Sequence, residues 1–436
     1  MLALRLTRAA HPAVHARRLA VSAAATGTGF LLLSTLGHAL THPEATASSA
    51  LRLAWCAIPL TATVYFAMAV ARTDPATRPR PGLAAIGLGP ARLMAVSATT
   101  TALSTLFGST LALLVFLHLR GDLTGLPFDG AASDFLAAGH PLPLPASLTL
   151  LALVPLASSA AVALMLRPRD TQVAARATRR AFGGFGKGSA KETFGSYGRF
   201  GARGGTKGAQ EEGAAAHDGT DTDTDDEPHP TTTPATRTPS PTALPWGAAT
   251  LAAGLAVEAY AARTASTPLT LPAGLPTGPA AVLLGWTLTA LGLALAGPGL
   301  THLCGRLLQT FRPGALRLLA GRGLMEESVR IGRPLGILCA VLSGAYTMAT
   351  LNGDRPTGPL SALGALLVTG CALGTLLTAA VESRQSRADT TAALLRLGAP
   401  AKTLRAAAAL RTTALLLVFT PLTLAVAQLA TLPLTT

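Results

Sequence analysis

The sequence predicts an all-α integral membrane protein with about nine transmembrane helices in two related halves, joined by a long disordered cytoplasmic linker. Apolar residues make up 49% of the 436-residue chain, and charged residues only 13%. The apolar residues gather into blocks that are nearly free of charge. Each block approaches the roughly 20 residues with which a helix crosses a hydrocarbon core of about 30 Å. Such helices satisfy their own backbone hydrogen bonds, so they need no soluble core around them.

Nine blocks of this kind follow one another along the chain. They are predicted at 19–40, 51–71, 93–118, 146–166, 246–263, 279–300, 331–351, 359–381 and 407–432. The block at 246–263 is the weakest, because it is short, rich in alanine and interrupted by Glu258. The first block follows Arg17 and Arg18, so a twin-arginine export signal is the alternative there. Its apolar run exceeds the roughly 7 to 15 residues of a signal sequence, which favours an uncleaved span.

The blocks divide the chain into an N-terminal membrane half (1–166) and a C-terminal membrane half (246–436). The segment between them, 167–245, is first basic and glycine-rich, then acidic, then rich in threonine and proline. This composition buries too little apolar surface to fold, which predicts a disordered linker. Its glycine, aromatic and arginine clusters can bind single-stranded nucleic acid. Anionic lipid headgroups explain the basic residues better, so we expect membrane lipid rather than nucleic acid as a partner.

Basic residues concentrate in alternate connecting segments. The formal net charge of +14 comes mainly from Arg5–Arg18, Arg72–Arg92, Arg306–Arg333 and Arg384–Arg405. Cytoplasmic loops carry such an excess of lysine and arginine. The distribution therefore predicts a multi-pass protein of the cell membrane with a cytoplasmic N-terminus.

No pattern of reactive side chains indicates catalysis. The four cysteines, Cys56, Cys304, Cys339 and Cys371, are widely spaced and are interpreted as small apolar fillers. Histidine, aspartate and glutamate outside the linker show no spacing typical of a metal site or an acid-base pair. Glu326 and Glu327 are interpreted as helix pairs with Arg330 and Arg333. The sequence thus predicts a protein that is not an enzyme and holds no metal.

Each half contains a basic segment with a Leu-Gly turn between two spans. In the first half it runs TDPATRPRPGLAAIGLGPARLMAVSATTTAL, and in the second ESRQSRADTTAALLRLGAPAKTLRAAAALRTTAL. Gly398 suits the end of a short helix, and Pro400 suits the first turn of the next. The expected result is a bent basic elbow. Two interpretations stay open: a partner pushes on the elbow, or the segment is an ordinary charged loop that fixes topology.

The segment 382–411 resembles the cytoplasmic signature of FtsX/MacB-type ABC transporter permeases. In that signature, arginines and an apolar turn lead into a Leu-Gly core and a following basic helix. The matching residues are Leu395, Arg396, Leu397, Gly398, Ala399 and Lys402. The first-half copy keeps Leu88, Gly89, Pro90 and Arg92, but Gly87 replaces the arginine before the turn.

The resemblance implies the permease subunit of an ABC transporter, in which a separate ATPase subunit docks on the elbows. The chain contains no G-x-x-x-x-G-K-[ST] phosphate loop, so ATP would be bound by the partner and the chain has no cofactor of its own. A homodimer or a second permease would complete the assembly. Members of the family commonly carry a large extracytoplasmic domain, whereas the loops near 41–50 and 352–358 are short. The expected cargo is therefore a lipophilic compound or an antimicrobial peptide taken from the membrane.

Two other functions remain as alternatives. One is a non-transporting regulator or scaffold that relays the motion of the ATPase to another protein. The other is an ATP-independent secondary transporter, which would need ionisable residues inside its spans. Glu258 is the one candidate, because a carboxylate at mid-helix costs on the order of 2.5 to 3.5 kcal/mol. It would either face a polar pathway or a basic partner, or lie at the membrane interface in contact with water.

Overall fold

The computed structural model describes most of the chain outside the predicted linker. The described residues are 12–74, 90–123, 130–133, 136–167, 243–264, 269–270, 276–277, 280–310, 314–352, 358–398 and 400–435. Most of the predicted linker, from 168 to 242, lies outside them, so its disorder stays a prediction. Within the described part, the elements are helices apart from one antiparallel pair of two-residue strands, β1 (Leu269–Thr270) and β2 (Pro276–Thr277).

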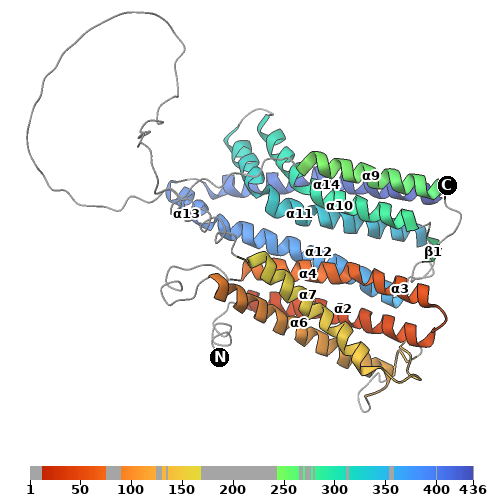
Figure 1. Cartoon of the computed structure of the whole chain (residues 1–436). Helices are drawn as coiled ribbons and strands as arrows, with labels where there is room; N and C mark the ends of the chain where they lie inside the picture. Colours follow the sequence, from red (N-terminus) through yellow and green to blue (C-terminus); the bar gives the residue numbers. More distant parts are fainter. Residues whose placement is uncertain are drawn as a thin grey trace, which may run out of the picture. The chain divides into compact units, whose positions relative to one another are not determined.

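The described residues of the first half form four long helical segments, whose arrangement is seen in Figure 1. These are α2 (Pro12–Thr41), the consecutive pair α3 (Thr46–Trp55) and α4 (Ala57–Thr73), α6 (Pro90–Arg120) and α7 (Leu144–Leu166). The break between α3 and α4 falls at Cys56, just before Pro59. A proline ring clashes with the carbonyl group four residues earlier, here that of Trp55, and so interrupts the helix. The second predicted span, 51–71, is therefore built from two helices.

The described residues of the second half form five long helices and one short one. These are α9 (Ala243–Thr264), α10 (Ala280–Thr310), α11 (Ala315–Asn352), α12 (Pro359–Ser386), α13 (Ala388–Arg396) and α14 (Ala401–Thr435). Across the described residues, eight helical segments are long and apolar enough to cross a membrane. The eight match every predicted span except 246–263, which forms α9. The prediction of an all-α, multi-pass membrane protein is confirmed.

Although α9 is not one of the eight candidate spans, it packs closely against α10. A Cβ atom on Gly292 would lie 2.5 Å from the backbone nitrogen of Leu251, and one on Gly254 would lie 2.5 Å from that of Thr289. The α9 residues in these close contacts are Leu244, Gly247, Leu251, Gly254 and Glu258. They recur every three or four positions and so form one helix face. Between helices in lipid there is no hydrophobic driving force, so their association depends on close packing. Small residues such as glycine allow the two backbones to approach closely enough for this.

The helices α10 and α11 use the same kind of contact. A Cβ atom on Gly297 would lie 2.1 Å from the carbonyl oxygen of Gly332, and one on Gly305 would lie 2.8 Å from that of Gly321. Antiparallel packing through glycines thus runs from α9 across α10 to α11.

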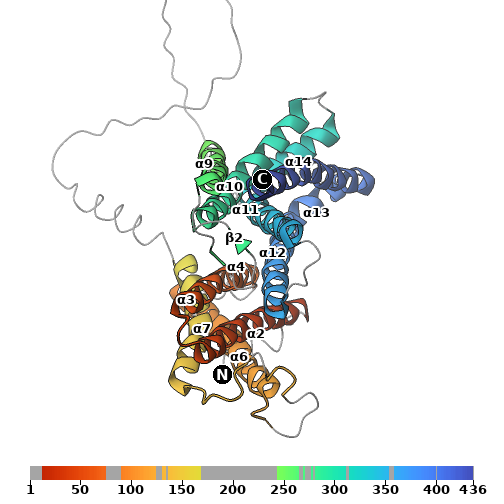
Figure 2. The same ribbon diagram turned by 90° about the vertical axis from the view of Figure 1, so that its right-hand side faces the viewer.

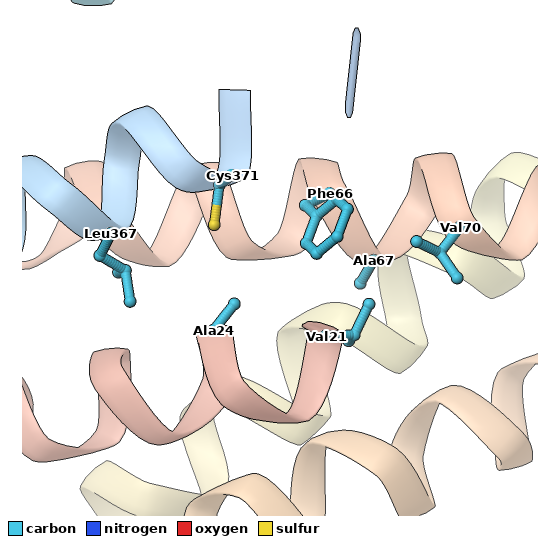
Figure 3. Close-up of a cluster of buried hydrophobic side chains, with 7 residues drawn as sticks. All are labelled: Val21, Ala24, Phe66, Ala67, Val70, Leu367 and Cys371. Atoms are coloured by element: carbon cyan, nitrogen blue, oxygen red, sulfur yellow. The ribbon is translucent and has the colours of Figure 1, made fainter. Parts of the chain in front are cut away.

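The two halves meet through α4 and α12, which lie between the two groups of helices in Figure 2. The core cluster in Figure 3 joins Val21 and Ala24 of α2 to Phe66, Ala67 and Val70 of α4 and to Leu367 and Cys371 of α12. The Thr63 hydroxyl, also on α4, lies 2.8 Å from that of Thr28 and 3.9 Å from the Cys371 sulfur. The C-terminal half therefore supplies one wall of the N-terminal core.

The packing repeats between the halves. Helix α2 packs on α4 and α6, and α11 packs on α12 and α14. Helix α7 follows the first set, whereas the α9–α10 hairpin precedes the second. The two halves thus differ in where the helices outside the repeated set lie in the chain: α7 follows the set in the first half, and α9 and α10 precede it in the second.

Candidate coupling elbow

Several helix ends of both halves come together at one end of the bundle, which we call the elbow end. Here α4, α7, α10 and α12 end, and α2, α6, α11 and α14 begin. Ion pairs and contacts connect them, among them Arg18 with Asp74 at 2.5 Å, Arg72 with Met165, and Gln309 with Met325. Helix α13 lies at this end (Figure 1).

The predicted bend around Gly398 is present. Gly398 has a φ of +86°, in the left-handed region that favours glycine. Its amide donates to the Leu395 carbonyl at 3.1 Å, and the Leu397 amide donates to that of Ala393 at 3.0 Å. Gly398 therefore ends α13 as predicted. Pro400 directly precedes the first residue of α14, one position earlier than predicted, and its carbonyl accepts the amide of Thr403.

The tip of the elbow is exposed. The side chain of Leu397 is 84% exposed and that of Leu395 is 47% exposed. Arg396 and Lys402 are exposed beside them, while Ala399 lies outside the described residues. Two leucines and two cations thus stand together on a surface that the described part of the bundle leaves uncovered.

The base of the elbow is held by an ion pair. Arg387, the single residue between α12 and α13, contacts the Glu327 carboxylate of α11 at 2.5 Å and donates to the Gly323 carbonyl at 2.7 Å. The Glu327 side chain is only 8% exposed. The charge of Arg330 in the same helix does act on Glu327, as predicted, but Glu327 forms its close ion pair with Arg387. Its partner is 60 positions away in the chain, which helical spacing does not reveal.

A second arginine ties α14 to the same segment of α11. Arg411 donates to the Leu319 carbonyl at 3.0 Å. A Cβ atom on Gly323 would lie 2.5 Å from the Arg411 guanidinium and 2.8 Å from that of Arg387. The lack of a side chain at Gly323 therefore lets both arginines reach α11.

The first half has an ion pair in the corresponding place. Arg18 of α2 contacts Asp74, which directly follows α4, and Arg17 donates to Thr73 at 3.1 Å. In each half an arginine-carboxylate pair thus joins the first helix of the repeated set, α2 or α11, to the end of α4 or α12. The arginine lies on the first helix in the N-terminal half, whereas the carboxylate does so in the C-terminal half. Leu88 and Gly89 lie outside the described residues. Pro90 is the first residue of α6, and Arg92 is exposed.

Glu258 lies between α9 and α10 and is 1% exposed. The indole N–H of Trp286 donates to its Oε1, while Oε2 has no hydrogen-bond partner within the described part of the chain. Of the two expected environments, water at the interface is therefore wrong. The carboxyl group lies inside the helix hairpin.

Among the residues that the structure describes, no three histidine, cysteine, aspartate or glutamate side chains gather in a way that could hold a metal ion. The chain matches no protein family, no curated protein and no solved structure.

Proposed function

We propose that the chain is the permease subunit of an ABC transporter in the cell membrane, driven by a separate ATPase subunit that docks on the elbow. The observation that carries this proposal is an elbow that is exposed at its tip and held by charged contacts at its base. An ordinary topological loop needs neither feature. In this proposal the elbow end is cytoplasmic, as is the N-terminus.

The tip has the chemistry of a docking surface. Exposed Leu395 and Leu397 can enter an apolar groove, while Arg396 and Lys402 select a partner with an acidic rim. The partner proposed here is a P-loop ATPase, as the resemblance of the segment 382–411 to ABC transporter permeases implies, and the absence of such a loop from the chain agrees with this.

The base offers a route for movement. A displacement of α13 passes to α12 through Arg387, and to α11 through the contacts of Arg387 with Glu327 and Gly323. Helix α12 also lines the core of the first half through Leu367 and Cys371. A push at one elbow would therefore shift helices of both halves. A homodimer or a second permease would place a second set of elbows on a second ATPase.

The proposed cargo is a lipophilic compound or an antimicrobial peptide that enters from the membrane. The connection between α2 and α3 at the opposite end is a short turn, in which the Ala45 amide donates to the His42 carbonyl. This turn holds no capture domain.

The test is affinity purification of the chain from its native membrane in mild detergent, followed by identification of P-loop ATPases. We expect an ATPase with the wild type and with the control Arg306→Glu, which reverses an exposed charge on α10. We expect none with Arg396→Glu. Equal loss in both variants would indicate non-specific attraction, and no ATPase with the wild type would contradict the proposal.

Reconstituted vesicles then separate a transporter from a regulator. A transporter shows ATPase activity that its cargo stimulates, together with movement of that cargo across the bilayer. A regulator or scaffold would bind the ATPase without either effect.

A further inference from the structure

A cavity of about 150 Å³ opens between the two halves near the elbow end. It lies among α4, α11 and α12, and its polar lining includes Tyr65, Arg72, Arg330, Arg333, Thr378 and Glu382. A single water needs only about 10 to 15 Å³ of such volume, so the cavity accepts a group of several heavy atoms.

The cavity carries an excess of positive charge. Three arginines face one carboxylate, that of Glu382. Among the described residues, neither Arg330 nor Arg333 has a carboxylate within 4 Å, although the charge of Arg330 acts on Glu327, and Arg72 contacts the sulfur of Met165. Arg18 and Arg387 at the same end do have carboxylate partners. The cavity arginines thus lack the close carboxylate partner that Arg18 and Arg387 each have among the described residues.

The other wall of the cavity is apolar. Met68 and Ala69 of α4, Val329 and Pro334 of α11, and Ala379 of α12 line it. Along α4 it extends from Arg72, in the last turn of the helix, back to Tyr65 about two turns earlier. The charges of Arg72 and Arg333 both act on the Tyr65 side chain, which places the three groups near one another. The site therefore combines a cationic end with an apolar end.

We propose that this cavity binds the phosphate-bearing headgroup of an anionic phospholipid from the leaflet at the elbow end. Guanidinium groups bind phosphate oxygens through paired, charge-assisted hydrogen bonds. A free phosphate ion offers the same chemistry to the arginines but makes no use of the apolar wall. Helix ends at this level lie where lipid headgroups lie. The inference rests on the membrane-spanning fold and is independent of the proposed ATPase.

The test measures lipid that stays bound to the full-length protein in mild detergent, by native mass spectrometry after addition of phosphatidylglycerol or phosphatidylcholine. The variant Arg330→Gln/Arg333→Gln removes two charges of the cavity that have no carboxylate within 4 Å in the described part of the chain. The control Arg306→Gln/Arg322→Gln removes two exposed charges from α10 and α11 outside the cavity. We expect the wild type and the control to retain phosphatidylglycerol preferentially, and the cavity variant to retain at least about tenfold less. Arg330 and Arg333 are exposed, so their substitution leaves the helix packing intact.

A second variant acts in the opposite direction. Glu382→Gln removes the one negative charge of the cavity, so retention of phosphatidylglycerol should rise. A purely structural role of these side chains would not produce a gain.

Three results would overturn the proposal. Equal retention of both lipids would show that charge plays no part. Equal loss in the cavity and control variants would show attraction to the surface as a whole. Release of the lipid by millimolar inorganic phosphate would assign the arginines to a soluble anion.

Discussion

Arg387 joins the base of the elbow to α11 through two contacts. It contacts Glu327, a carboxylate that is only 8% exposed, and it also donates to the Gly323 carbonyl. Removing one partner of a buried ion pair leaves the other charge unmatched, whereas replacing both partners by apolar groups costs much less. The structural contribution of the pair is therefore testable separately from any ATPase.

We expect Arg387→Met to lower the free energy of unfolding by about 2 to 4 kcal/mol, less than for a fully buried pair because Arg387 is 23% exposed. The double variant Arg387→Met/Glu327→Met should recover part of this loss. Thermal unfolding in detergent measures both, with the exposed Arg384→Met as the control. Additive effects of the two substitutions would contradict a direct interaction.

Substitutions of Gly398 test the effect of backbone conformation apart from that of side-chain packing. It has a φ of +86°, and a Cβ atom there would meet nothing within 4 Å. We expect Gly398→Val to disturb the end of α13 by about 1 to 2 kcal/mol, and Gly398→Asn to cost less, because asparagine tolerates this region. Hydrogen exchange of the amides around 395–403 measures the effect. Gly370→Val is the control, since that position has open space and no positive φ. Equal exchange in all three variants would show that Gly398 sets no bend.

Glu258 distinguishes two of the functional alternatives. Its Oε1 accepts the Trp286 indole N–H, and a glutamine can accept the same bond. We expect Glu258→Gln to keep the fold, and Glu258→Ala to lose about 1 to 3 kcal/mol because the indole is left without its acceptor. If ATP drives transport, Glu258→Gln retains it. Loss of vesicle transport with an intact fold would instead favour the secondary transporter.

At the scale of helices, the apolar blocks predicted the positions of the spans but not their limits. The blocks at 93–118 and 146–166 became α6 and α7 with only a few added residues. Helix α11 begins at Ala315 rather than at 331, because its arginine-rich first part is helical although it is not apolar. Glu327, which pairs with Arg387 at the base of the elbow, lies in this part. The apolar pattern alone therefore placed Glu327 outside a span.

The hairpin of α9 and α10 depends on glycines whose role the apolar pattern does not show. We expect Gly292→Ala to destabilise the protein by about 1 to 3 kcal/mol, because the added Cβ would lie 2.5 Å from the Leu251 backbone nitrogen. Gly344→Ala on α11 is the matched control, since a Cβ there meets nothing within 4 Å and alanine favours a helix. Unfolding temperatures in detergent compare the two. A larger loss for Gly344→Ala would contradict the observed register.

For the whole molecule, the repeat predicted from two Leu-Gly segments is also seen in packing and charge. In each half, an arginine-carboxylate pair joins the first helix of the repeated set, α2 or α11, to the end of α4 or α12; the pairs are Arg18 with Asp74 and Arg387 with Glu327. The sequence alone did not predict these pairs, because the two residues of each pair lie 56 and 60 positions apart. In addition, the arginine comes first in the chain in one pair and the carboxylate comes first in the other. The similarity of the halves thus extends to the packing of three helices and to the place of one ion pair.

The contact between α4 and α12 tests whether the halves move against each other. Thr63 Oγ1 lies 3.9 Å from Cys371 Sγ, so Thr63→Cys should form a disulfide with Cys371 under oxidant. The background replaces the other three cysteines by alanine, and a protease site inserted in the segment 205–210 reveals the cross-link as halves that stay together after cleavage. Thr61→Cys is the control, because Thr61 is exposed.

If movement of α12 against α4 is part of the transport cycle, the cross-link should abolish cargo-stimulated ATPase activity, and a reductant should restore it. A cross-linked protein with full activity would mean that α4 and α12 move as one body. The elbow would then act on α11 and α14 alone, through Arg387 and Arg411. Absence of a cross-link would contradict the contact itself. The choice among these outcomes decides how far a push on α13 travels, because α12 is the element shared by the elbow and the core of the other half.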